Sequence, residues 1–131
     1  MTIKDPIASP ALTALLVESD EAVRGTLVSV LEEAGYTVAG YETGETALAA
    51  LQAGIPAAIL ITEVRLPGLD GWQLARSARR LRPSLPVLYI PAFHEGRTQQ
   101  VTQSFVLPKP FRPRALTMAI RLMARPLVTY H

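Results

Sequence analysis

Residues 11–35 read ALTALLVESDEAVRGTLVSVLEEAG, and this stretch decides the fold. Its first seven residues form an apolar run of strand length that ends at acidic residues. Apolar residues then recur at helical spacing, namely Val23, Leu27, Leu31 and Ala34. Asp20 is suited to cap the first turn of this helix, and Gly35 follows as a stop signal. The stretch therefore predicts a strand followed directly by a helix.

The same unit repeats along the rest of the chain. Further strands are predicted at residues 36–39, 57–62, 86–90 and 105–107. Helices are predicted after the cap Thr43, after Asp70 with its capping-box partner Gln73, and from Pro113 onward. Residues 92–104 are polar and carry little periodicity, so a fourth helix there is expected to be short or irregular.

Five alternations of strand and helix define the fold class. They predict an α/β protein with one parallel sheet, right-handed crossovers and helices on both faces. In such a doubly wound sheet, the ligand site lies at the carboxyl ends of the strands, near the point where the strand order reverses.

Length and composition limit the function classes. A chain of 131 residues and 14.2 kDa is normally one domain, and 49% apolar against 18% charged residues predicts a packed globule. The absence of cysteine excludes disulfides, cysteine zinc sites and thiol catalysis, and it favours a cytoplasmic location. The apolar residues 11–17 are too few for a membrane helix, and no signal peptide is expected.

The charge balance permits contact with nucleic acid but does not demand it. Thirteen basic residues face eleven acidic ones, for a net charge of +2. Four arginines gather in residues 76–82, three of them on one outward helical face: Arg76, Arg79 and Arg80. Such a face is usually solvated, and no helix-turn-helix follows it, so nucleic-acid binding is the weaker interpretation.

Charged side chains follow several predicted strands. Glu18, Ser19 and Asp20 come after the first strand, Glu63 after the third, and Lys109 after the fifth. Carboxylates for a hard cation and an ammonium for an anion are what a phosphoryl-transfer or divalent-metal site needs. A salt-bridged rim of the sheet would use the same residues, and from the residues alone both interpretations stay open.

Three strings resemble the motifs of response-regulator receiver domains: ESDEAVR at residues 18–24, VRLPGLDG at 64–71 and LPKPF at 107–111. The resemblance runs from about residue 12 to residue 123. It implies a (βα)5 flavodoxin-like sheet with strand order 2-1-3-4-5. We therefore expect three segments: an N-terminal extension at 1–10, a receiver domain at 11–124 and a C-terminal tail at 125–131.

The resemblance also places the family's phosphorylation site. In the family, an aspartate ending the third strand takes a phosphoryl group, helped by Mg²⁺ on an acidic pair after the first strand. The aspartate position is Glu63 here, and the extra methylene moves the attacking oxygen by about 1.5 Å. The acidic pair becomes Glu18 and Ser19, while Asp20 is expected to cap a helix. With only Glu18, Asp20 and Glu63 as weak metal candidates, Mg²⁺ is expected to bind weakly and no other cofactor is expected.

Other family positions are altered as well. The hydroxyl residue that ends the fourth strand is Pro91, and the aromatic switch residue of the fifth strand is Val106. Phe105 lies one place earlier and so faces the other side of the sheet. Lys109 is unaltered, and Pro110 is a candidate for the cis proline bond that follows this lysine in the family. The pattern predicts a degenerate receiver, or pseudo-receiver.

We therefore expect a stand-alone signalling module that acts through protein–protein interaction without phosphorylation. One hypothesis is that Glu63 pairs with Lys109 and imitates the phosphorylated state. The alternatives are a receiver still phosphorylated at Glu63, Ser19 or Thr62, and a regulator that binds nucleic acid.

The expected partner is a protein: a kinase, an output protein or a second copy of the chain. Receivers often pair through the face made by the fourth helix, fifth strand and fifth helix, where Met118, Leu122 and Met123 offer apolar surface. No enzyme activity is expected, because His94 and His131 have no serine elbow or glycine-rich phosphate loop to work with. No membrane partner is expected.

Overall fold

The computed structural model describes residues 13–93 and 99–123. Its five strands are β1 (Thr13–Val17), β2 (Thr37–Tyr41), β3 (Ile59–Thr62), β4 (Val87–Tyr89) and β5 (Ser104–Val106). All neighbouring strands are parallel, and the order across the sheet is β2-β1-β3-β4-β5. The predicted flavodoxin-like sheet and its strand order are confirmed.

Four helices are described: α1 (Glu21–Glu33), α2 (Gly44–Gln52), α3 (Gly71–Leu81) and α4 (Pro113–Met123). The predicted caps are in place at the first three. The Asp20 side chain accepts a hydrogen bond from the backbone N–H of Val23 at 3.0 Å, and Thr43 caps α2 in the same way. Asp70 and Gln73 form the complete capping box of α3. These local signals fix where each helix begins.

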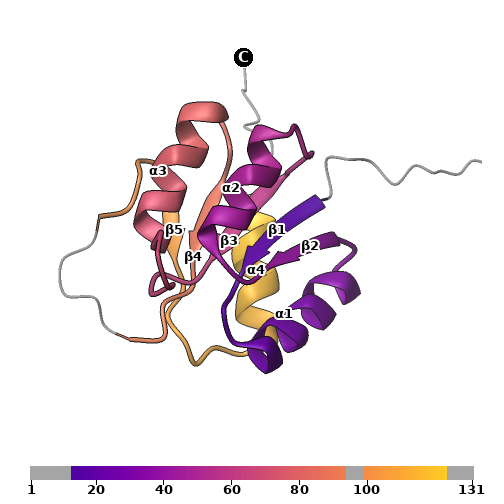
Figure 1. Cartoon of the computed structure of the whole chain (residues 1–131). Coiled ribbons are helices and arrows are strands. Elements are labelled where there is room, and N and C mark those ends of the chain that lie inside the picture. The colour runs from indigo at the N-terminus through magenta and orange to yellow at the C-terminus, as the bar shows by residue number, and fades with distance from the viewer. Residues whose placement is uncertain (1–12, 94–98, 124–131) are drawn as a thin grey trace, which may run out of the picture.

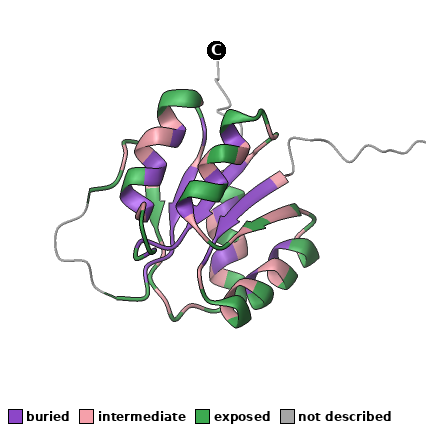
Figure 2. Ribbon diagram, viewed as in Figure 1, coloured by how far each residue is buried: buried purple, intermediate pink, exposed green. Residues whose placement is uncertain are grey.

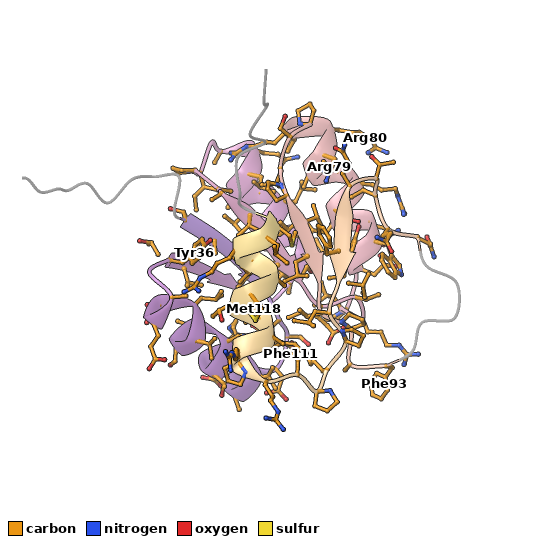
Figure 3. All side chains as sticks on the ribbon, turned by 180° about the vertical axis from the view of Figure 1, so that it is seen from behind. Tyr36, Arg79, Arg80, Phe93, Phe111 and Met118 are labelled. Atoms are coloured by element: carbon orange, nitrogen blue, oxygen red, sulfur yellow. The ribbon has the colours of Figure 1, made fainter. Side chains whose placement is uncertain are left out.

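The helices cover both faces of the sheet. Helices α2 and α3 lie on one face and α1 and α4 on the other, as Figure 1 shows from the front and Figure 3 from behind. Each pair of helices encloses a separate apolar cluster with the sheet between them. The three central strands are buried except for Thr13 at the start of β1, while the outer faces of the helices are exposed (Figure 2). Near-continuous apolar strands reflect this double covering.

The edge strand β2 departs most from its predicted position. The sequence predicts residues 36–39, whereas the strand runs from Thr37 to Tyr41. At the sheet edge its side chains are only half-buried, so no continuous apolar run marks its end. The other described strands fall within or next to the predicted ranges, and residues 11 and 12 of the first predicted strand lie outside the described residues.

The connection between β4 and β5 is irregular in the part that the structure describes. Residues 91–93 and 99–103 form no helix, in line with the weak periodicity there. Residues 94–98, which include the candidate His94, lie outside the described residues, as do His131 and the predicted end segments 1–10 and 125–131. The last helix is therefore α4 here, although it takes the place of the family's fifth.

Arg79 holds this irregular connection against α3. Its guanidinium donates three hydrogen bonds: to the carbonyl oxygens of Leu85 at 2.7 Å, Thr102 at 2.7 Å and Gln103 at 2.9 Å. Gln103 has a positive φ of 53°, which brings the chain into β5. Side-chain hydrogen bonds thus position a segment that has no helical hydrogen bonds of its own in its described part.

No helix among the described residues is long and apolar enough to cross a membrane.

Candidate functional site

The carboxyl ends of the parallel strands bring Glu18, Glu63 and Lys109 together. Glu18 directly follows β1, Glu63 directly follows β3, and Lys109 comes three residues after β5. Lys109 Nζ donates to Glu63 Oε1 at 2.8 Å and also to Glu18 Oε1. The two glutamates are only 3% and 4% exposed. The site is therefore a nearly buried cluster in which one ammonium bridges two carboxylates.

The second carboxylate oxygen of Glu63 faces backbone amides from two loops. Glu63 Oε2 accepts hydrogen bonds from the N–H groups of Val64 at 2.7 Å, Arg65 at 3.4 Å and Ala92 at 3.3 Å. Converging amide dipoles of this kind form an anion-binding concavity. Together with Lys109, they make a complete anion pocket, and its occupant is the protein's own glutamate.

Glu18 also forms hydrogen bonds with neighbouring residues. Its Oε2 accepts from the backbone N–H of Asp20 at 3.1 Å, and its carbonyl oxygen accepts from Arg24 Nη1 at 2.7 Å. The hydrogen bonds of the described residues join neither the Ser19 nor the Asp20 side chain to Glu63 or Lys109. The Asp20 carboxylate caps α1 instead. Of the predicted acidic pocket, only Glu18 therefore reaches the cluster.

The charge state of Lys109 follows from its two partners. Burial by itself lowers the pKa of this ammonium, but hydrogen bonds and Coulombic attraction from Glu18 and Glu63 outweigh burial and raise the pKa above the ordinary value of 10.5. Lys109 is thus fully charged at neutral pH.

The donor set does not fit the divalent cation that the resemblance to receiver domains implies. Such a cation prefers carboxylate and carbonyl oxygens, and here Lys109 lies between the two carboxylates where the cation would have to bind. Ser19 offers no carboxylate, and Asp20 is engaged in capping. Among the described residues, no group of three or more acidic or histidine side chains could hold a metal ion. We therefore assign no metal role to these residues.

The remaining family positions lie around the cluster. Pro91 directly follows Ile90 at the end of the β4 region, and its carbonyl oxygen accepts from the backbone N–H of Lys109 at 2.8 Å. Pro91 offers no hydroxyl and no N–H. The peptide bond between Lys109 and Pro110 is cis. At this end of the sheet, Pro91 thus supplies a backbone acceptor but no side-chain hydroxyl.

Tyr89 is an aromatic residue that the sequence reasoning overlooked. Tyr89 and Val106 are register partners on β4 and β5, so they share one face of the sheet, while exposed Phe105 lies on the other. The buried Tyr89 ring packs on Trp72, with centroids 4.5 Å apart, and its hydroxyl accepts from the backbone N–H of Val101 at 3.1 Å. Burial raises the pKa of this phenol. An aromatic side chain thus fills the interior beside Val106 from the neighbouring strand.

The backbone amides around Glu63 were also missed. Val64, Arg65 and Ala92 contribute main-chain N–H groups, which leave no side-chain signature in a sequence. The one usable signal was the position of residue 92 just after a strand, where a loop turns over the sheet end.

Comparison with known proteins agrees with this geometry. A family model described as the response regulator receiver domain matches residues 14–121. The chain is 35% identical over 113 residues to the response regulator receiver protein CpdR of Brucella abortus, covering 83% of this chain and 93% of that protein. It is 31% identical over 117 residues to the transcriptional regulatory protein CreB of Escherichia coli, covering 86% of this chain but only 51% of CreB.

Solved structures show the same fold. The crystal structure of a response regulator receiver protein from Sinorhizobium medicae matches with a TM-score of 0.82 and 30% identity, covering 86% of this chain and 94% of that one. The receiver domain of the hybrid histidine kinase CckA matches with a TM-score of 0.74 and 31% identity, covering 86% and 99%. The chain belongs to the response regulator receiver family.

Membership defines the class of function. Receiver domains are signalling modules of two-component systems, and their partners are proteins such as kinases and output proteins.

Proposed function

We propose that this chain is a receiver whose signalling state is set by Glu63 rather than by phosphorylation, and that it acts through protein–protein contacts. The observation that carries the proposal is the occupied anion pocket. The Glu63 carboxylate receives Lys109 on one oxygen and three backbone amides on the other. The pocket that would stabilise a phosphoryl group is filled by a side chain of the protein.

The same contacts weaken Glu63 as a phosphoacceptor. A carboxylate oxygen that accepts several hydrogen bonds, or lies against an ammonium, is a poorer nucleophile because its lone pairs are engaged. An incoming phosphoryl group would need the amide and ammonium donors that Glu63 already occupies. Phosphoryl transfer depends on positioning and charge neutralisation, and Pro91 and Ser19 supply neither.

The ion pair also supports imitation of the activated state. In the family, the phosphorylated aspartate pairs with the lysine. Here an anion one methylene longer than aspartate makes a 2.8 Å contact with Lys109 without modification. A permanent pair of this kind would leave the module in one state at neutral pH.

The phosphorylation claim is tested with a small phosphodonor. We expect no mass increase when the protein is incubated with acetyl phosphate and Mg²⁺ and examined by intact mass spectrometry. The matched control is the Ser19→Asp, Glu63→Asp, Pro91→Thr variant, which restores the family's residue types and is expected to gain a phosphoryl group. Phosphorylation of the unaltered chain at Glu63, Ser19 or Thr62 would contradict the proposal.

A second copy of the chain is the partner that we propose for the face of β5 and α4. Phe105, Met118 and Leu122 are large apolar side chains exposed there, and Figure 3 shows Met118 on the outer side of α4. We expect a dimer by analytical ultracentrifugation at micromolar concentration, and Met118→Glu with Leu122→Glu is expected to yield monomers. A monomer for the unaltered chain would refute this part of the proposal.

A further inference from the structure

A basic groove runs between α3 and the irregular connection that precedes β5. It encloses about 460 Å³ and is lined by Arg76, Arg79 and Arg80 of α3 and by residues 99–102. No acidic side chain lines it among the residues that the structure describes. In Figure 3, Arg79 and Arg80 lie close together near the end of α3. Three cationic side chains thus share one small concave surface.

The arginines differ in how firmly they are held. Arg79 is fixed by its three hydrogen bonds to carbonyl oxygens, so its charge is held in place within the groove wall. Arg76 makes one long contact, 3.5 Å from Nη1 to Gln99 Oε1. Within the described residues, Arg80 has no hydrogen-bonded or ionic partner. The groove therefore combines a preorganised positive wall with two guanidinium groups available to a ligand.

The charge distribution of the whole chain directs anions to this side. Among the described residues, those up to residue 60 include seven acidic and one basic residue, whereas those from residue 61 onward include two acidic and nine basic ones. The strand order separates the two halves, because β1 and β2 lie toward one edge of the sheet and β4 and β5 toward the other. Such a separation of charge steers an anionic partner toward the α3 and β5 side.

We propose that this groove binds an acidic, extended peptide segment of a protein partner. The inference rests on the proposed function in taking the partner to be a protein. The size of the groove suits a few side chains, because ligand pockets span about 300–1,000 Å³. The Gln99 amide and the backbone beside edge strand β5 add hydrogen-bonding groups that suit a peptide. A duplex would instead need basic residues spread along a wider face.

Fluorescence anisotropy with a labelled oligoglutamate peptide tests the groove directly. We expect saturable binding to the full chain, and about tenfold weaker binding for the Arg76→Gln, Arg80→Gln variant, from two lost ion pairs. The matched control is Arg112→Gln, Arg114→Gln, which removes the same charge from exposed positions next to and within α4 and is expected to bind as the unaltered chain does. Arg80 is exposed and Arg76 is partly exposed, and circular dichroism checks that each variant is folded.

Three results would overturn the inference: no binding of oligoglutamate, equal weakening in both double variants, or tighter binding of duplex DNA to the same arginines. Glu63→Gln is expected to leave oligoglutamate binding unchanged, because Glu63 does not line the groove. The peptide-binding inference can therefore be refuted while the absence of phosphorylation is confirmed. Phosphorylation of the unaltered chain would likewise leave the peptide-binding result unaffected.

Discussion

Replacing Lys109 by methionine is expected to lower the free energy of unfolding by about 3 kcal/mol, because removal of one member of a buried ionic cluster leaves uncompensated charge. Methionine keeps much of the volume but removes the only ammonium in contact with Glu18 and Glu63 among the described residues. Both carboxylates are nearly fully buried, so water cannot replace the lost partner without rearrangement. Urea denaturation of the two proteins at neutral pH measures the difference.

Two further variants distinguish the loss of the ionic cluster from a nonspecific loss of stability on substitution. Arg112→Met removes an exposed cation nearby and is expected to change stability by no more than about 0.5 kcal/mol. Adding Glu18→Gln and Glu63→Gln to Lys109→Met is expected to recover a large part of the loss, because no buried charge then remains unpaired. A Lys109→Met variant as stable as the unaltered chain would show that the cluster is not a coupled ionic unit.

The contribution of Lys109 also depends on pH in a defined direction. Its pKa is raised in the folded protein above the ordinary 10.5, so folding favours the protonated form. The stabilisation is therefore complete below about pH 10.5 and is lost as the pH rises through the folded pKa. The difference between the unaltered chain and Lys109→Met should shrink on the alkaline side of that value.

Gly71→Ala is expected to destabilise the fold by about 2–3 kcal/mol, because overpacking that forces backbone movement has costs of this size. A Cβ at residue 71 would overlap the carbonyl oxygen of Glu63 and lie 2.9 Å from the Cα of Val64. Both contacts are with backbone, which cannot swing aside as a flexible side chain can. The backbone of Glu63 would have to move, and the amide contacts of its carboxylate would move with it. Thermal or urea unfolding measures the loss.

Gly25→Ala is the matched control for this substitution. Gly25 lies inside α1, and a Cβ there would meet nothing within 4 Å. Alanine should stabilise the helix by about 0.5–1 kcal/mol, since glycine is the poorer helix former. If Gly71→Ala stabilised the protein as Gly25→Ala does, this would contradict the close packing of α3 against the Glu63 backbone.

The fold was predictable because local signals and the global pattern agree. The uniformly apolar residues of β1 and β3 mark doubly covered strands, and Asp20, Thr43 and Asp70 mark helix starts. The order of the elements then restricts the topology to a doubly wound sheet. Strand β2 departs most from its predicted range, because a half-exposed edge strand has no sharp apolar limit.

The candidate site was predictable in its side chains but not in its backbone. Glu63 and Lys109 are predicted to lie at the same sheet end because each follows a strand of a parallel sheet, and the structure shows them in contact. The amides of Val64 and Ala92 were not predictable, because any residue type supplies an N–H and only the loop conformation decides where it points. The sequence therefore located the anion pocket without showing that the glutamate fills it.

The sequence pattern also does not predict the long-range hydrogen bonds of polar side chains. Arg79 was interpreted as part of a solvated arginine face, yet it binds carbonyl oxygens more than twenty residues away. Tyr89 was counted as a strand residue, yet its hydroxyl holds Val101 in the irregular connection. Periodicity reports which face a residue occupies and not which backbone atom its polar tip reaches.

The most direct test of the central claim is an NMR titration of the unaltered chain with beryllofluoride and Mg²⁺, which together imitate an aspartyl phosphate. The resonances to follow are the backbone amides of Val64 and Ala92, which donate to Glu63 Oε2. If Glu63 occupies the anion pocket, these amides will not shift in the unaltered chain, and they will shift in the Ser19→Asp, Glu63→Asp, Pro91→Thr variant. Saturable shifts of the same amides in the unaltered chain would show that the pocket is open to a phosphoryl group and would contradict the account.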